Sequence, residues 1–241
     1  VDMLHGDFGE SYNTGLPVFE EIFTRFPSTL KLSTVAMFFA ALIGIPVGVI
    51  SAVRQYSFTD AISTTLALLF ASIPSFVMGL VLMLVFSLHL RWLPATGLDS
   101  IESYILPALT LSTATMATLV RMTRSTMLEV LKQDYIRTAR AKGVNERTVV
   151  LKHALKNAML PIVTVIGVDF GYLLGGTVVI ESVFSINGLG TLLITAIRMK
   201  DTPTVMAAIM FVTLAYSIVN LVVDIIYAFI DPRIKSQYER G

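Results

Sequence analysis

Five long apolar runs alternate with shorter polar segments along the chain. The runs occupy residues 30–53, 61–88, 104–120, 161–180 and 204–230. Each is long enough to cross a bilayer as a helix, which takes about 20 apolar residues (range about 17–25). None shows the alternation of apolar and polar positions that is typical of membrane barrel strands. The pattern therefore predicts an all-α integral membrane protein with five spans in this chain.

Proline and glycine mark special positions within this pattern. Pro46 and Pro74 lie inside the first and second runs and predict kinks, because proline removes a backbone donor. Gly44 and Gly48 are one turn apart and predict a close approach by another helix. Ahead of the first run, residues 18–26 predict a short amphipathic helix that follows a polar, glycine-containing segment.

Composition supports the membrane class and excludes several activities. The chain is 54% hydrophobic and only 15% charged, whereas soluble domains are usually about 25% charged. It has no cysteine, its three histidines are far apart, and it lacks the Gly-x-x-x-x-Gly-Lys-[Ser/Thr] motif of phosphate-binding loops. We therefore predict no catalytic residue, no metal site and no nucleotide site in this chain.

Positive charge gathers in one polar segment between the third and fourth runs. Residues 121–157 hold nine Lys and Arg against three acids, a net charge of +6, whereas the whole chain is +1. This segment, the 54–60 turn and the C-terminal tail together hold 13 of the 18 Lys and Arg. By the positive-inside rule, residues 121–160 and the C-terminus are cytoplasmic and residues 1–30 extracytoplasmic. Five spans and an outside N-terminus also predict a further span before Val1.

The basic segment predicts two short helices. Asp134 is a suitable N-cap for a helix over residues 135–142, and Gly143 is a natural residue to end it. Asn145 can cap a second helix, which we expect to lie along the membrane surface until Pro161 begins the next span. Its expected apolar face consists of Val150, Leu151, Ala154, Leu155 and Ala158. Two interpretations stay open: the segment docks in a partner's groove, or its charges only fix topology and contact anionic lipid.

Within the spans, Asp169 is the most informative residue. It lies about eight residues into the fourth run, and a carboxylate at such depth normally faces a bundle interior or an aqueous cavity. We assign it to a translocation pathway; the alternative is a hydrogen bond or ion pair to another helix. Gly167, Gly171 and Gly175 recur every four residues around it and predict a helix-packing stripe.

Two further features have structural interpretations. Asn220 and Asp224 are one turn apart in the last run, and we expect them to pair with Arg121 or Arg124. The stretch FSINGLG, residues 184–190, is either a glycine-rich turn or a loop that caps the outer cavity or contacts a binding protein.

Four stretches together resemble one family. The run YIRTARAKG…KHALKNAMLP resembles the "EAA" loop of ABC importer permeases, in the dipeptide, oligopeptide and nickel branch. The stretches GDFGESY, ESVFSINGLG and NLVVDIIYAFIDPRI resemble the same branch, so the likeness covers essentially the whole chain. Arg137 stands where the general loop pattern has its glutamate, and Asn187 replaces the usual proline of FSxPGLG.

The resemblance implies a type I importer transmembrane domain that lacks catalytic residues. It divides the chain into an extracytoplasmic segment 1–29, a transmembrane domain 30–230 with a cytoplasmic coupling loop 129–160, and a cytoplasmic tail 231–241, in a prokaryotic inner membrane. The implied ATPase-coupling residues are Tyr135, Ile136, Arg137, Thr138, Ala139, Arg140, Ala141, Lys142 and Gly143. The implied partners are a second homologous permease, two ATP-binding subunits that hold ATP and Mg²⁺, and an extracytoplasmic solute-binding protein. Expected solutes are dipeptides, oligopeptides, glutathione or nickel chelates.

Two other classes of function are alternatives to the importer. The first is a stand-alone secondary transporter or channel with Asp169 as its ion site. Such a protein would work alone on an ion gradient, whereas an importer subunit needs ATP and partners. The second is a membrane-embedded enzyme, which the absence of a catalytic constellation disfavours.

Overall fold

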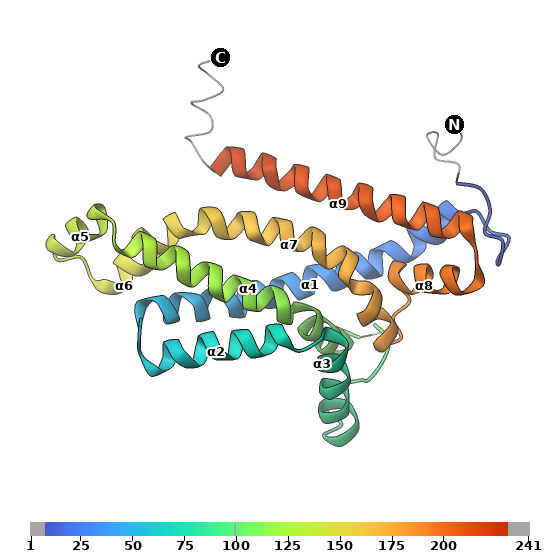
Figure 1. Ribbon diagram of the computed structural model, residues 1–241, viewed down its shortest axis with the longest axis horizontal. Helices are drawn as coiled ribbons and strands as arrows, with labels where there is room; N and C mark the ends of the chain where they lie inside the picture. The colour runs from blue at the N-terminus through green and yellow to red at the C-terminus, as the bar shows by residue number, and fades with distance from the viewer. Residues whose placement is uncertain (1–7, 99, 231–241) are drawn as a thin grey trace, which may run out of the picture. The chain divides into compact units, whose positions relative to one another are not determined.

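The computed structural model describes residues 8–98 and 100–230, and every named element in this part of the chain is helical (Figure 1). The elements are α1 (Val18–Val53), α2 (Phe58–Ser72), α3 (Ser75–Leu82), the π-helical η2 (Met83–His89), the 3₁₀ turn η3 (Glu102–Tyr104), α4 (Ile105–Leu131), α5 (Asp134–Ala141), α6 (Glu146–Thr148), the π-helical η4 (Val149–Ala154), α7 (Leu155–Val183), α8 (Leu189–Met199) and α9 (Thr202–Ile230). The predicted all-α class is confirmed.

The predicted spans are found, with one interruption. Four of the described helices are long and apolar enough to cross a membrane, and α2 with the α3–η2 helix makes a fifth if the broken pair is one span. The sequence predicted one kinked helix over residues 61–88, and the structure has two separate helices there. Helix α2 ends at Ser72 because Ile73 is extended (φ −84°, ψ 125°), and Pro74 is the N-cap of α3. Proline disfavours the helical conformation of the residue before it, which explains the break.

Elsewhere helices continue through prolines where the sequence predicted boundaries. The prediction of a separate helix over 18–26 is wrong. Helix α1 runs without a break from Val18 to Val53 and includes Pro27 and Pro46. Pro161 likewise lies inside α7 instead of starting it. Proline removes only one backbone hydrogen bond, and a long apolar helix keeps the rest of its ladder.

The described chain divides into two compact units that both draw on the long helices. Within the described residues, the first comprises 8–37, 74–98, 100–112 and 170–219, and the second comprises 38–73, 113–169 and 220–230. The expected cytoplasmic tail, 231–241, lies outside the described residues.

In the first unit, α1, α8 and α9 share an apolar core. Its fully or nearly fully buried members are Val18, Ile22, Leu189, Leu192, Ala207 and Ala208. Aromatic rings border this core, where Phe23 and Phe26 meet Phe211 edge-on at centroid distances of 5.4 and 4.9 Å. Edge-to-face pairs of this kind add to the stabilisation from buried area.

A fully buried carboxylate fixes the FSINGLG stretch in the same unit. Glu181, near the end of α7, accepts hydrogen bonds from the Thr29 hydroxyl (2.6 Å) and from the Thr191 backbone N–H in α8 (3.0 Å). Thr29 in turn accepts from the Leu189 N–H at 2.9 Å. A Cβ at Gly188 would collide with the Glu181 carboxylate, so this turn requires glycine. The stretch is therefore a tightly held turn between α7 and α8.

A second carboxylate of this unit ties the N-terminal segment to the turn between α8 and α9; Figure 1 shows the backbone of these two segments. Asp201 is buried and accepts hydrogen bonds from the Ser11 hydroxyl, the Thr204 hydroxyl and the Tyr12 N–H. Burial by itself would raise the pKa of Asp201, but these hydrogen bonds outweigh it and hold the pKa below its ordinary value. The carboxylate therefore stays ionised and bonded at neutral pH.

The second unit contains a buried ion pair. Arg124 of α4 donates from Nε to Asp60 Oδ1 at 2.7 Å and from a terminal nitrogen to Oδ2 at 2.8 Å. Asp60, only 4% exposed, also accepts from the Ser51 hydroxyl and the Tyr56 N–H. The pair joins α4 to the first turn of α2. The expected pairing of Asn220 and Asp224 with Arg121 or Arg124 stays a prediction, because the Asp224 side chain lies outside the described residues.

Close helix packing reinforces that junction, as Gly44 and Gly48 predicted. A Cβ placed on Gly44 would lie 2.9 Å from the Leu119 Cβ, and one on Gly48 would lie 2.6 Å from the Thr123 Cβ. Helix α1 therefore approaches α4 as closely as its backbone allows.

We predict that breaking the Asp60–Arg124 pair destabilises the protein. Asp60→Asn and Arg124→Gln should each lower the free energy of unfolding by about 3 kcal/mol, since each leaves one buried partner uncompensated. The double variant should lose less than the sum of the two. Thermal and denaturant unfolding in detergent would measure this. Arg137→Gln is the control, since its ion pair with Asp134 is solvent-exposed and 3.7 Å long. Additive losses would show that the pair does not couple.

Candidate functional site

The predicted coupling helix exists, with its beginning shifted by one residue. Helix α5 covers Asp134–Ala141, and Gln133, in extended conformation (φ −69°, ψ 149°), is the N-cap in place of Asp134. The Gln133 side chain makes no capping hydrogen bond. Asp134 instead lies in the first turn, where a negative charge is favoured by the helix dipole.

Gly143 ends this helix as the sequence predicted. Its φ of +78° is left-handed, a conformation that glycine adopts without steric cost. The Gly143 N–H donates to the Arg140 carbonyl (2.9 Å) and the Val144 N–H donates to the Ala139 carbonyl (3.2 Å). These two bonds form a Schellman motif. The turn after α5 thus has one defined geometry.

Helix α5 presents most of its surface to solvent. Ile136 is fully buried and Tyr135 is 45% exposed. The other predicted coupling residues are exposed, apart from the partly buried Ala139; they are Arg137, Thr138, Arg140, Ala141, Lys142 and Gly143. Burial raises the pKa of the Tyr135 hydroxyl. The helix therefore offers an aromatic ring and three basic side chains around one buried anchor.

An ion pair connects α5 to the segment after Gly143. Arg140 contacts Glu146 through Nε (3.1 Å) and a terminal nitrogen (2.6 Å). Both side chains are about half exposed, so the pair contributes about 1 kcal/mol or less to stability. Its main effect is to orient α5 and α6, which follow one another after α4 (Figure 1).

The second predicted helix begins as expected and then departs from the prediction. The Asn145 side chain accepts from the Arg147 N–H at 2.9 Å, as a helix cap does. Residues Val149–Ala154 are π-helical and pass directly into α7, so no separate surface helix ends at Pro161. Because a π-turn holds more residues than an α-turn, the buried face shifts. Val149 is buried, whereas the expected Leu151 is 60% exposed.

Asp169 lies on α7 within the second unit, partly exposed. Among the described residues, no hydrogen bond or ion pair engages its carboxylate. The alternative structural role, a bond to another helix, therefore has no partner in this part of the chain. An unpaired carboxylate within a span normally faces water or a polar solute.

The three glycines of the predicted packing stripe have different surroundings. A Cβ at Gly167 would collide with Val223 of α9, so α7 and α9 pack closely there. Gly175 has open space around its Cβ position. Gly171 and Gly175 instead line a groove of about 330 Å³ beside Tyr172 and Tyr216, within the first unit. Gly171 is buried and Gly175 is exposed, and helix packing at these two positions stays a prediction.

Comparison with known proteins identifies the family. The model of the "binding-protein-dependent transport system inner membrane component" family matches residues 44–236. Two proteins called glutathione transport system permease protein GsiC, from Salmonella typhimurium (strain LT2) and Escherichia coli (strain K12), are each 47% identical to this chain. The alignments cover 97% and 96% of this chain and 76% of each relative.

The chain belongs to this family of transport permeases. It is a non-catalytic permease subunit of an ABC importer in the inner membrane, and such importers work with ATPase subunits and a solute-binding protein. The predicted resemblance to the peptide and nickel branch is confirmed.

Solved structures agree on the fold. A chain of the MetNI methionine ABC transporter in an inward-facing conformation has a TM-score of 0.76 at 18% identity, over 87% of this chain and 96% of that one. A chain of an amino acid ABC transporter has a TM-score of 0.60 at 16% identity, over 89% of this chain and 94% of that one. At these identities the likeness establishes the type I importer fold alone.

Sequence reasoning missed three residues that hold the permease's turns, namely Asp60, Glu181 and Asp201. Each is an acidic residue placed at or near the end of an apolar run. That position was a usable signal, because an acid there must find donors once the helix is buried.

We predict that Gly143→Ala loosens the end of α5. A left-handed alanine costs about 1 kcal/mol, which should reduce hydrogen-exchange protection of the Val144 amide about fivefold. Gly143→Asn should lose less, because asparagine tolerates this conformation better. Gly175→Ala is the matched control: it has ordinary helical geometry and open space, so protection of α5 should not change. Equal protection in all three variants would contradict the assigned role of Gly143.

Proposed function

We propose that this permease forms one half of a translocation pathway and meets its ATPase subunits through α5 and the turn at Gly143. A second homologous permease supplies the other half. Two ATP-binding subunits, which hold the ATP and Mg²⁺, sit against the α5 of each permease. The observation that supports this is the exposure of α5, whose aromatic and basic side chains surround a single buried anchor. A short helix of that kind suits docking in a groove.

The proposed orientation places α5 in the cytoplasm, where ATP is available. It follows from the excess of Lys and Arg in residues 121–160 and in the tail. Residues 1–30 and the turn between α7 and α8 then face the outside, where a binding protein delivers solute. Closure of the ATPases would displace α5 and switch the spans between inward- and outward-facing states by a rigid-body movement.

The proposed substrate is a short peptide, with glutathione as the first candidate. The name of the 47% identical relatives points to glutathione. Asp169 supports a solute of this class, because an unpaired carboxylate in the pathway would attract the ammonium group that such peptides have.

The coupling part of the proposal predicts a charge-reversal effect. Arg137→Glu in the complete transporter should insert normally yet reduce co-purification of the ATPases and solute-stimulated ATP hydrolysis by at least about tenfold. Lys152→Glu makes the same change of charge at an exposed position outside α5 and should behave like the wild type. If Arg137→Glu couples normally and Lys152→Glu does not, the docking surface lies after Gly143.

The substrate part predicts an effect of Asp169→Asn on uptake. In proteoliposomes with the binding protein and ATPases, uptake of glutathione should require ATP and should fall about tenfold or more in the variant, since a charge-assisted contact is lost. Basal ATP hydrolysis should stay unchanged. Glu102→Gln, an exposed carboxylate outside the pathway, is the control. Uptake that continues without ATP on an ion gradient would contradict the proposal and favour a secondary transporter.

A further inference from the structure

A groove with an apolar floor opens between the end of α1 and the helix that begins at α6. Its volume is about 580 Å³. The residues that line it, all in the second unit, are Val49, Ile50, Val53, Arg54, Glu146, Arg147, Val150 and Leu151. Ile50, Val53 and Leu151 are 48%, 43% and 60% exposed. These side chains present a continuous apolar surface that no described part of the chain covers.

The charges at the rim of this groove are unbalanced. Its only acidic lining residue, Glu146, is already bound by both donors of Arg140. Asp60, the buried acid at the neighbouring turn, is likewise occupied by Arg124. Arg54 and Arg147 are exposed, and within the described residues no carboxylate contacts either guanidinium. The rim therefore presents two free positive charges that a local acid does not neutralise.

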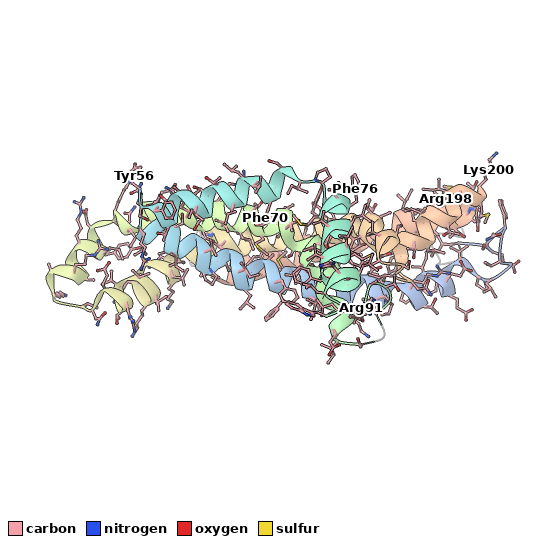
Figure 2. The ribbon with its side chains drawn as sticks, turned by 90° about the horizontal axis from the view of Figure 1, so that it is seen from below. Tyr56, Phe70, Phe76, Arg91, Arg198 and Lys200 are labelled. Carbon is pink, nitrogen blue, oxygen red and sulfur yellow. The ribbon has the colours of Figure 1, made fainter. Side chains whose placement is uncertain are left out.

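The turn next to the groove carries exposed aromatic residues of the kind found at membrane interfaces. Tyr56 and Phe58 are 90% and 79% exposed, and Figure 2 shows Tyr56 at the turn that joins α1 to α2. Exposed aromatic rings at helix ends are typical of the level of the lipid headgroups. The apolar floor would then face acyl chains and the two arginines would lie at headgroup height.

We propose that this groove binds one anionic phospholipid. Its phosphate lies against Arg54 and Arg147, and an acyl chain lies along the floor between α1 and η4. Basic pockets between spans recognise anionic headgroups in this way. The assignment of the lipid to the cytoplasmic leaflet rests on the orientation proposed above; binding itself does not.

The combination of features favours a lipid over a protein segment as the occupant. The family is an inner membrane component, so phospholipid is present at every exposed apolar helix face. Two arginines line the same groove as the apolar side chains, and this combination matches a charged headgroup joined to a hydrocarbon chain. Helix α5, the proposed ATPase contact, contributes no lining residue to the groove, although its Arg140 binds the lining residue Glu146.

The test is native mass spectrometry of the complete transporter during titration with phosphatidylglycerol or phosphatidylcholine. The wild type should retain one phosphatidylglycerol per permease more tightly than phosphatidylcholine. Each arginine near a headgroup contributes about 1 kcal/mol, so Arg54→Gln or Arg147→Gln should weaken retention about fivefold and the double variant about 30-fold. Arg121→Gln, an exposed arginine outside the groove, is the matched control and should bind like the wild type.

Several outcomes would overturn the proposal. Equal retention by the double variant and the wild type would remove the arginines from the site. Equal retention of both lipids would indicate an unselective apolar surface. A cross-link from Ile50→Cys to another protein segment would identify a protein occupant; the chain has no cysteine of its own to interfere. Labelling of Tyr56→Cys from either side of the membrane tests the orientation separately, so failure of the topology would not be mistaken for failure of lipid binding.

Discussion

A carboxylate buried in an apolar helical protein must be bonded by donors from the protein itself, because no bulk water reaches it. Four carboxylates are buried in the described part of the chain, and three of them join segments far apart in the sequence. Glu181 binds a hydroxyl 152 residues away, Asp201 one 190 residues away, and Asp60 an arginine 64 residues away. In each case the acid lies near a helix end, where the chain turns and backbone groups also need partners. The positions of these turns depend on the three acids.

The groups assigned to function are those that the described structure leaves unbonded or exposed. Asp169 has no partner among the described residues, in contrast to the three structural acids. The basic side chains divide in the same way: Arg124 is fixed on Asp60 and Arg140 on Glu146, whereas Arg54 and Arg147 are exposed and contact no carboxylate of the described residues. Burial and bonding therefore separate residues that hold the fold from residues available to a solute, a lipid or a partner.

The features of the fold that could be predicted are those that depend on residues close together in the sequence. The apolar runs predicted the helices, Gly143 predicted the end of α5, and Gly44 predicted a close contact with another helix, which the structure identifies as α4. Proline was a poor guide, because its effect depends on context: Pro74 breaks a helix whereas Pro27, Pro46 and Pro161 lie inside helices. The π-helical turns also escaped prediction, since an extra residue per turn leaves the apolar composition unchanged while it rotates the buried face.

The partners of charged residues could not be predicted, because they are properties of the tertiary fold. The sequence led us to expect an acid of the last span beside Arg121 or Arg124, and it did not reveal that Asp60 of α2 binds Arg124. This pairing also affects how the positive charge of the basic segment is interpreted. If its charges served topology alone, any basic residue could replace another. Arg124 and Arg140 instead make bidentate hydrogen bonds to the carboxylates of Asp60 and Glu146, which lysine cannot reproduce. Part of the segment's positive charge is therefore structural, and only the remainder is available for lipid and ATPase contacts.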